Sequence, residues 1–362
     1  MKKTLSDWHY ARPELAQTYL SLFALGLVSA RCLFARRRMG KTEFLEKDFV
    51  PAAKKEGYVT AYINLWNLQT DAASAIVSLL YKTIAPKRFG KIKIKISGKI
   101  PGIAEGAVET ELQSFDQRAS CLALMDIMEK FDKTKFSLMF VIDEAQVLAY
   151  AENSDFTHAL RASLDIRKDR IKVMFAGSSE TTLRRMFGIS SEPFYNWAPL
   201  EPFQLLGKEF VIAMVNRVNA ICKFELSLDD ALTAFSELKN TPEFFRRYIE
   251  YYLNNPDLGS DAMLKETKHS VLSDDKFKKQ WQSLQAADKV LLTMITNSER
   301  DLYGKSAIQR LGKALGIEDS VKVSMAQNAL RRLSEKNIIT KIDHGIYQFE
   351  DEAFGDWVKH RD

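Results

Sequence analysis

The sequence contains little cysteine. Three cysteines, Cys32, Cys121 and Cys222, lie far apart in 362 residues and form no C-x-x-C pair. A sparse, odd set of this kind is typical of reduced thiols and excludes a disulfide framework as the basis of the fold. The five histidines form neither an H-E-x-x-H motif nor a Cys/His cluster. This pattern argues against a dedicated zinc site.

Long hydrophobic runs are also missing. The most apolar stretch, residues 19–30, is about 12 residues long and ends at Arg31, whereas a helix that spans a bilayer needs roughly 20. The amino-terminal sequence MKKTLSDWHY has no apolar core, so we expect no secretory leader. We therefore expect a soluble, cytoplasmic protein with no membrane partner.

The sequence has no strong excess of one charge. Lys and Arg number 52 against 47 Asp and Glu, which gives a formal net charge of +5, and this total decides nothing about partners. Hydrophobic residues make up 46% and charged residues 27%. These values are typical of globular proteins and exclude disordered and collagen-like chains. The length predicts two or three domains.

Short apolar segments alternate with helical patterns in the first part of the chain. Strands are predicted at residues 29–35, 58–65, 138–142, 171–176 and 198–203, and helices at 13–25, 41–49, 71–84, 116–131 and 179–187. Continuous apolar strands between helices predict an α/β fold with a parallel sheet that is covered on both faces. Beyond residue 206 helical patterns dominate, and residues 255–284 are polar and lysine-rich, which favours a partly helical linker.

A phosphate-binding loop is predicted between the first strand and its helix. Residues 35–42, ARRRMGKT, have the phosphate-loop spacing, with alanine in place of the usual first glycine. Backbone N–H groups of such a loop surround phosphate oxygens at a helix start. Gly40 allows close backbone approach, Lys41 neutralises the β- and γ-phosphates, and Thr42 offers its hydroxyl to Mg²⁺. The predicted cofactors are ATP and Mg²⁺.

The predicted nucleotide-binding residues of this segment include the three consecutive arginines. They are Ala35, Arg36, Arg37, Arg38, Met39, Gly40, Lys41, Thr42 and Glu43. The arginines are either additional phosphate ligands or exposed loop residues.

Two acidic residues follow the apolar strand at 138–142. Asp143 is predicted to bind Mg²⁺ and Glu144 to activate the attacking water as general base. Acids at strand ends also cap helices, but a phosphate loop about 100 residues upstream favours the catalytic interpretation.

Candidate residues also follow the strand at 171–176. Ser178 is predicted either to contact the γ-phosphate or orient water, or to cap the next helix. Arg184 and Arg185 are candidates for an arginine finger toward a neighbouring subunit's nucleotide, or residues of a solvated helix face.

These motifs resemble those of a known family. The matching segments are YARPEL (10–15), FARRRMGKTEFL, LMFVIDEAQVL, VMFAGSSE, TPEFFRR and YQFEDEAFGDWV. The chain resembles the AAA+/STAND-type P-loop ATPases, in particular the archaeal-ATPase and origin-initiator-like branch with a carboxyl-terminal winged helix. The resemblance implies that Arg12 and Pro13 lie near adenine and that a lid arginine, Arg246 or Arg247, lies near the γ-phosphate. The family's usual Gly-x-x-Arg signature is absent.

Two segments concentrate positive charge. Residues 86–101 carry six basic residues and no acid; the KIKIKI core alternates with period two, so Lys91, Lys93 and Lys95 share one strand face. This segment is either a hairpin that follows a nucleic-acid backbone or a lysine-protected edge strand.

The second basic segment, residues 304–341, carries eight basic and three acidic residues. A recognition helix is predicted over 321–336, followed by a wing that turns at residues 343–345. The predicted DNA-contacting residues are Lys322, Ser324, Gln327, Asn328, Arg331 and Arg332. The same module would also suit contacts with protein.

Together these patterns predict an α/β protein with a parallel-sheet P-loop core, and the resemblance implies the strand order 5-1-4-3-2. The expected domains are an ATPase core (1–205) with a basic hairpin insert at about 86–112, a helical lid (206–260) and a winged-helix domain (281–362). The expected function is an ATPase that binds DNA and whose nucleotide state controls assembly, with ATP at the interfaces of a homo-oligomer. Two alternatives are a nucleotide-switched signalling or scaffold ATPase of stress or phage defence, whose winged helix binds protein, and an accessory ATPase of transposition or replication initiation.

Overall fold

The computed structural model describes most of the chain. Its described residues are 8–66, 68, 71–84, 117–272, 274–297, 299, 302–317, 322–336, 338–343, 346–349 and 352–361. The chain divides into two compact units, Met1–Leu205 and Leu206–Asp362. No helix within the described residues is both long enough and apolar enough to cross a membrane.

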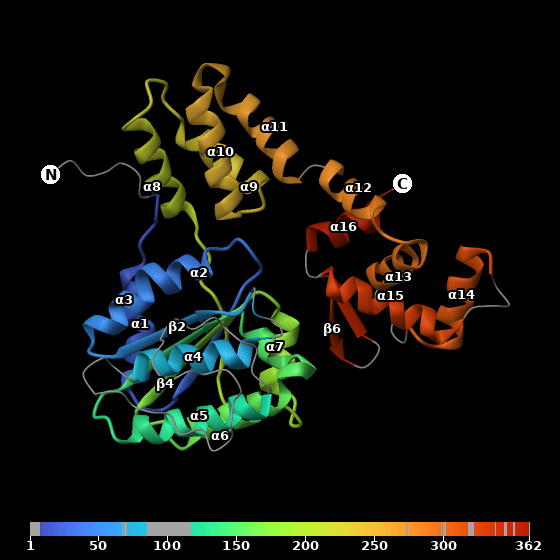
Figure 1. Cartoon of the computed structure of the whole chain (residues 1–362). Coiled ribbons are helices and arrows are strands. Elements are labelled where there is room, and N and C mark those ends of the chain that lie inside the picture. The colour runs from blue at the N-terminus through green and yellow to red at the C-terminus, as the bar shows by residue number, and fades with distance from the viewer. Residues whose placement is uncertain are drawn as a thin grey trace, which may run out of the picture. The chain divides into compact units, whose positions relative to one another are not determined.

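A five-stranded sheet forms the centre of the first unit (Figure 1). Its strands are β1 (Ala30–Phe34), β2 (Val59–Asn64), β3 (Leu138–Asp143), β4 (Ile171–Gly177) and β5 (Leu200–Pro202). All four neighbouring pairs are parallel, and the order is β2-β3-β4-β1-β5. This is the predicted order 5-1-4-3-2 read from the other edge, so the predicted P-loop core is confirmed.

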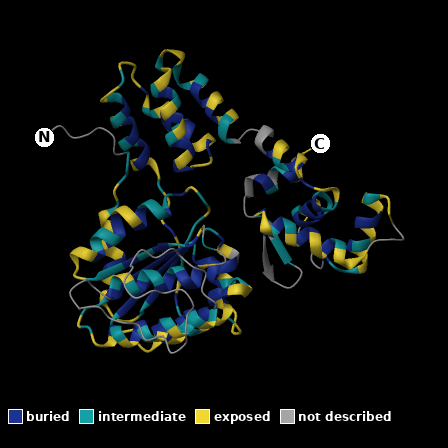
Figure 2. Cartoon of the chain, viewed as in Figure 1, coloured by how far each residue is buried: buried dark blue, intermediate teal, exposed yellow. Residues whose placement is uncertain are grey.

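Helices cover both faces of the sheet because successive side chains of its central strands point in opposite directions. In β3, Phe140 and Ile142 pack into one core, whereas Met139 and Val141 pack into the other. The first core is closed by α4 (Ala72–Ile84), α5 (Gln117–Asp132), α6 (Ser154–Asp165) and α7 (Glu180–Gly188), and the second by α1 (Pro13–Ala24), α2 (Lys41–Phe44) and α3 (Val50–Lys55). Figure 2 shows the buried strands between helices with exposed outer faces.

The helical segment after the phosphate loop contains a π-helical turn, Leu45–Phe49, between α2 and α3. Pro51 explains it: proline has no N–H, and in a regular α-helix its ring would clash with the carbonyl of Lys47. The backbone stays in the right-handed helical region at Phe44 and Val50, so the helical segment continues without a break to Lys55.

Two helical regions differ from the prediction. Helix α6 was not predicted, although Phe156, Leu160 and Leu164 recur at helical spacing and are buried. The predicted linker at 255–284 is more helical than expected, with α11 (Gly259–Leu272) and α12 (Asp274–Gln282).

The second unit is built mainly from helices. Helices α8 (Lys208–Asn219), α9 (Leu228–Glu237) and α10 (Pro242–Asn254) are joined by ring contacts of Phe210, Phe235 and Phe245 at 5.3–5.9 Å between centroids. A further core joins α12 to elements that follow it: α13 (Ala286–Thr296), α14 (Lys305–Leu315), α15 (Val323–Glu335), β6 (Ile339–Asp343), β7 (Ile346–Phe349) and α16 (Glu352–His360). Strands β6 and β7 pair antiparallel.

Candidate nucleotide-binding site

The predicted phosphate loop connects β1 to α2 at the carboxyl edge of the sheet. Gly40 has φ 81°, a left-handed conformation that favours glycine. Arg38 is also left-handed, with φ 67°, and the fully buried side chain of Met39 anchors the loop between them. The local sequence therefore gives the sharply turned backbone that a phosphate loop requires.

Lys41 is a buried cation that lies against its own loop. Its side chain is 5% exposed, and Nζ donates hydrogen bonds to the carbonyls of Ala35 (2.5 Å) and Arg36 (3.3 Å). Burial lowers the pKa of Lys41, whereas the carboxylates of Glu144 and Asp143 raise it. An ammonium held inside the loop, opposite two carboxylates, suits the predicted role of neutralising phosphate.

Asp143 lies at the end of β3 and is fully buried. The Thr42 hydroxyl donates to its Oδ2 at 2.5 Å, and the Asn64 amide and Tyr62 hydroxyl donate to the same atom at 3.3 Å and 3.5 Å. The backbone N–H of Glu144 donates to Oδ1 at 3.0 Å. Burial is the largest cause of a pKa raised to about 6, while the Thr42 hydrogen bond acts in the opposite direction.

The donor set at Asp143 fits Mg²⁺. Thr42 and Asp143 offer oxygen atoms, and Mg²⁺ binds through one or two protein oxygens together with phosphates and waters. Within the described residues no group of three or more His, Cys, Asp and Glu could hold a metal. The Thr42 and Asp143 oxygens would supply two ligands, and phosphate and water would supply the others.

Glu144 is held by two polar side chains. Its backbone is left-handed (φ 54°), and its Oε2 accepts hydrogen bonds from Ser178 Oγ (2.8 Å) and from the Gln146 amide. Gln146 also donates to Ser178 Oγ at 3.3 Å. The structure thus brings together Lys41, Asp143, Glu144 and Ser178.

The sequence analysis missed several residues of this site, among them Gly177, Asn64, Gln146 and Tyr62. A Cβ on Gly177 would overlap Gln146 Oε1, so the last position of β4 needs glycine to admit the Gln146 amide. Asn64 pairs in register with Asp143; as a polar residue at the end of a predicted strand, it carried a signal that could have identified it. Gln146 carried no comparable signal.

Arg12 reaches the phosphate loop from the segment before α1. Its guanidinium lies over the rings of Phe44 (4.9 Å) and Phe203 (4.6 Å) and donates to the carbonyls of Gly40 and Gln204, both at 3.2 Å. Burial lowers the pKa of Arg12. Pro13 begins α1 next to it. Through these contacts Arg12 connects the phosphate loop to the segment that follows β5.

Glu43 faces the amino-terminal segment. It contacts His9 Nδ1 (3.3 Å) and Lys47 Nζ (3.3 Å), and His9 also contacts Asp48 (2.8 Å). Its described contacts are therefore with neighbouring side chains.

The predicted finger arginines are engaged within the chain. Arg184 pairs with Glu180 at 2.6 Å and is 60% exposed. Arg185 donates to the carbonyl of Ala149 at 3.1 Å and pairs with Glu192 at 3.4 Å.

The remaining predicted residues lie elsewhere. Arg246 lies half-buried in α10 of the second unit. The insert at 86–112, with Lys91, Lys93 and Lys95, lies outside the described residues.

On α15, Ser324, Gln327, Asn328 and Arg331 are exposed and recur at helical spacing, and Lys322 is exposed at its start. Arg332 instead donates to the buried Asp288 at 2.6 Å.

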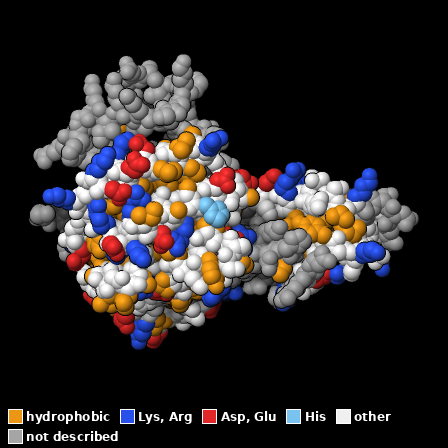
Figure 3. All heavy atoms as spheres, turned by 90° about the horizontal axis from the view of Figure 1, so that it is seen from below, with side chains coloured by type: hydrophobic (Ala, Val, Ile, Leu, Met, Phe, Trp, Pro, Cys, Tyr) orange, Lys and Arg blue, Asp and Glu red, His pale blue; other side chains and the backbone are white. Residues whose placement is uncertain are grey.

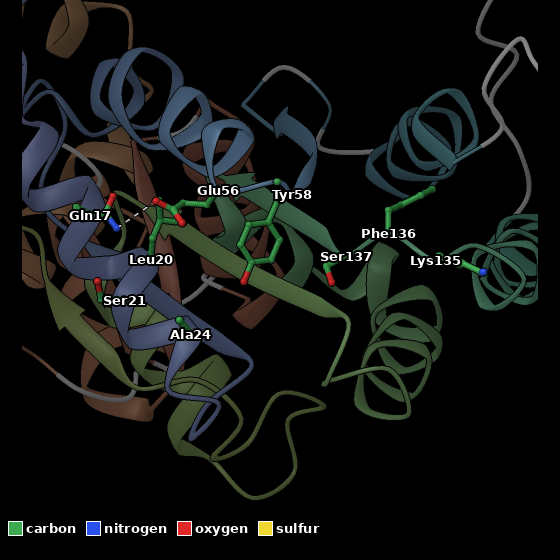
Figure 4. Close-up of a pocket in the computed structure, with 10 residues that line it drawn as sticks. Gln17, Leu20, Ser21, Ala24, Glu56, Tyr58, Lys135, Phe136 and Ser137 are labelled. Carbon is green, nitrogen blue, oxygen red and sulfur yellow. Dashed lines mark hydrogen bonds between the residues drawn. The ribbon is translucent and has the colours of Figure 1, made fainter.

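A cavity of about 470 Å³ lies at the opposite edge of the sheet (Figure 4). Its walls come from α1 and from the segments before β2 and β3, and Gln17 Nε2 donates to Glu56 Oε1 at 3.4 Å across one side. None of its lining residues is a predicted site residue. Basic and acidic side chains are interspersed over the described surface seen in Figure 3, so that face gathers no single charge.

Known structures share this fold, although no family sequence model and no curated protein sequence matches the chain. A Walker-type ATPase of Pyrococcus abyssi is 16% identical with a TM-score of 0.54, over 96% of this chain and 95% of that one. The ORC2 protein of Aeropyrum pernix in its ADP form is 14% identical with a TM-score of 0.55, over 98% and 96%. The ORC1 protein of Aeropyrum pernix in complex with DNA is 12% identical with a TM-score of 0.52, over 100% and 95%. At the level of the fold, the predicted resemblance is confirmed.

Proposed function

We propose that the chain is a cytoplasmic ATPase of the AAA+ type, in which ATP binding and hydrolysis control assembly on DNA. One observation carries the ATPase proposal: Lys41, Thr42, Asp143 and Glu144 meet in a single polar cluster at the carboxyl edge of the sheet. The fold supports it, because structures of the similar ORC2 protein are an ADP form and ADPNP–ADP complexes. The sparse, widely spaced cysteines support a reducing compartment.

Each residue of the cluster has a role that follows from its position. Lys41 and the loop N–H groups bind phosphate, and Thr42 and Asp143 would hold Mg²⁺. The metal would neutralise charge on the β- and γ-phosphates. Glu144 accepts a proton from water, and Ser178 and Gln146 fix the direction of its carboxylate.

Two substitutions test the ATPase proposal. We expect Lys41→Ala to weaken ATP binding about 100-fold or more, because it removes a buried charge-assisted contact. Lys47→Ala is the matched control, since Lys47 lies on the same helical segment but is 47% exposed. Equal ATP affinity of the Lys41→Ala and wild-type proteins in calorimetry would exclude the phosphate-loop assignment.

Glu144→Gln separates hydrolysis from binding. We expect hydrolysis to fall about 100-fold or more while ATP affinity stays within about threefold. Full turnover by this variant would remove Glu144 as the base.

We further propose that residues 206–260 act as a lid and that residues 281–362 form a winged-helix domain that binds DNA. Helix α15 presents Ser324, Gln327, Asn328 and Arg331 on one exposed face, and side chains of these types bond to base edges and phosphates. The similar ORC1 protein was solved in complex with DNA, which supports a DNA partner for this chain.

A gel shift over a salt series, with and without ATP, tests the DNA proposal. We expect affinity for duplex DNA to fall steeply with salt, because phosphate contacts release counterions. Salt-independent binding, or none, would contradict it and favour a protein partner for α15.

We also propose that ATP lies at the interface of a homo-oligomer, with Arg184 supplied by the neighbouring subunit. Arg184 is 60% exposed and its partner Glu180 is 47% exposed, so their ion pair can be exchanged at small free-energy cost. Mixing Lys41→Ala subunits with Arg184→Ala subunits is expected to restore part of the ATPase activity. Mixtures as inactive as the separate variants would contradict a shared site.

A further inference from the structure

Arg37 differs from the two arginines beside it in the phosphate loop. Arg36 and Arg38 are exposed, whereas Arg37 is half-buried. Its guanidinium carbon lies 4.1 Å from the centroid of the Trp66 ring. The Arg37 guanidinium is therefore held against an aromatic ring.

Trp66 is itself tied to the predicted metal site. It follows β2, is 36% exposed, and its backbone N–H donates to Asn64 Oδ1 at 2.9 Å. The amide of Asn64 donates to Asp143 at 3.3 Å. The Arg37–Trp66 pair is thus connected through Asn64 to the buried carboxylate of Asp143.

Arg37 directly follows the backbone that holds the Lys41 ammonium. Nζ of Lys41 donates hydrogen bonds to the carbonyls of Ala35 and Arg36, the two residues that precede Arg37 in the loop. An anion placed between the two cations would be attracted by both. In a phosphate loop the lysine meets the β- and γ-phosphates, so the terminal phosphate is the group that brings such an anion.

We propose that Arg37 is the residue by which the site distinguishes a nucleoside triphosphate from a diphosphate: it leaves the Trp66 ring to bind the terminal phosphate that Lys41 contacts. This inference rests on the proposed ATPase site. A charge-assisted, bidentate contact of arginine with phosphate is stronger than a cation–π contact with a partly exposed ring. A diphosphate lacks the terminal group, so Arg37 stays on Trp66.

Binding affinities test the proposal, with ADP and a non-hydrolysable ATP analogue as probes. We expect Arg37→Ala to weaken binding of the analogue about tenfold, the size of one charge-assisted contact, and binding of ADP less than about threefold. Lys47→Ala removes a positive charge from the helical segment that follows the loop, at a position that is 47% exposed, and is expected to leave the analogue-to-ADP ratio unchanged. Arg37→Lys is expected to be intermediate, because lysine keeps the charge but not the planar fork.

Tryptophan fluorescence gives an independent readout. The chain has five tryptophans, so the Trp66 signal is the difference between wild type and Trp66→Phe. We expect the analogue to change this difference and ADP to leave it nearly constant, and we expect Arg37→Ala to abolish the response to the analogue.

The outcomes separate this inference from the proposed function. Retained ADP binding by Arg37→Ala shows that the variant is folded. If Arg37→Ala weakens both nucleotides equally or neither, or if Trp66 responds equally to both, the Arg37 inference is wrong while the ATPase site stands. If the wild-type chain binds neither nucleotide, the proposed function fails, and this inference with it.

Discussion

The phosphate-loop site and the exposed face of α15 hold polar side chains in opposite ways. At the loop, Asp143 is fully buried and bonded to Thr42 and Asn64. On α15, Arg331 is 71% exposed and its ion pair with Glu335 spans 3.7 Å. Buried polar groups need partners, whereas exposed ones are satisfied by water. Function and stability are therefore coupled at the loop and separable on α15.

Arg332 breaks this contrast, because it lies on α15 but behaves like a buried site residue. Its Nη2 donates at 2.6 Å to Asp288, which is fully buried and also accepts from the backbone N–H of Gln285. We expect Arg332→Ala to lower the free energy of unfolding of the second unit by about 3 kcal/mol, because Asp288 keeps a buried charge without its counter-ion. Denaturant unfolding measures this change.

The control for Arg332 neutralises its partner. Asp288→Asn in the Arg332→Ala background is expected to recover part of the loss, because the asparagine carries no charge. An Arg332→Ala protein as stable as wild type would mean that Arg332 belongs to the solvent-facing surface with Arg331.

Gly177 tests the coupling at the loop. A Cβ there would overlap Gln146 Oε1 and lie 3.1 Å from Leu183 Cδ1. We expect Gly177→Ala to lower the free energy of unfolding by about 2 kcal/mol and to impair hydrolysis, because the displaced Gln146 amide no longer holds Glu144. In a Gln146→Ala background the loss in stability is expected to fall below about 1 kcal/mol. An equal loss in both backgrounds would assign the strain to Leu183.

At Asp143 the coupling between site and fold is expected to make stability depend on pH. Its pKa is raised from 3.8 to about 6, chiefly by burial, so the folded chain retains a proton that the unfolded chain has already released. The stability that this proton contributes is present at low pH and is lost as the pH rises through about 6. At pH 7 the site therefore holds a carboxylate at a cost in folding free energy.

Removal of that carboxylate is expected to stabilise the nucleotide-free chain. We expect Asp143→Asn to raise the free energy of unfolding by about 1–2 kcal/mol at pH 7, with the gain shrinking toward pH 4, while Mg²⁺-dependent nucleotide binding is lost. Asp165→Asn, at a site that is 52% exposed, is the control. A gain that does not vary with pH would mean that the charge of Asp143 is not its cause.

The contrast between buried and exposed polar side chains also explains which features of the molecule the sequence could predict. The strand order follows from the resemblance to P-loop ATPases. The cluster of Lys41, Thr42 and Asp143 follows from the spacing of motifs, because parallel strands bring their carboxyl ends to one edge. Gln146 could not be found in this way, since its position depends on the left-handed backbone of Glu144.

On α15 the sequence shows two adjacent arginines and no difference between them. Only the packing separates Arg331, which faces solvent, from Arg332, which faces Asp288. The contact of Arg37 with Trp66 could not be predicted for a similar reason. It joins the loops after β1 and β2, and only the folded sheet defines the relative position of these loops.

The smallest expected change in stability is at Arg331. We expect Arg331→Ala to alter the free energy of unfolding by less than about 0.5 kcal/mol, because its ion pair is exposed. If α15 contacts DNA phosphate through this side chain, the slope of log affinity against log salt falls by about 1. An unchanged slope would remove Arg331 from the interface, and a large loss of stability would show that the exposed face of α15 is as strongly coupled to the fold as the phosphate loop.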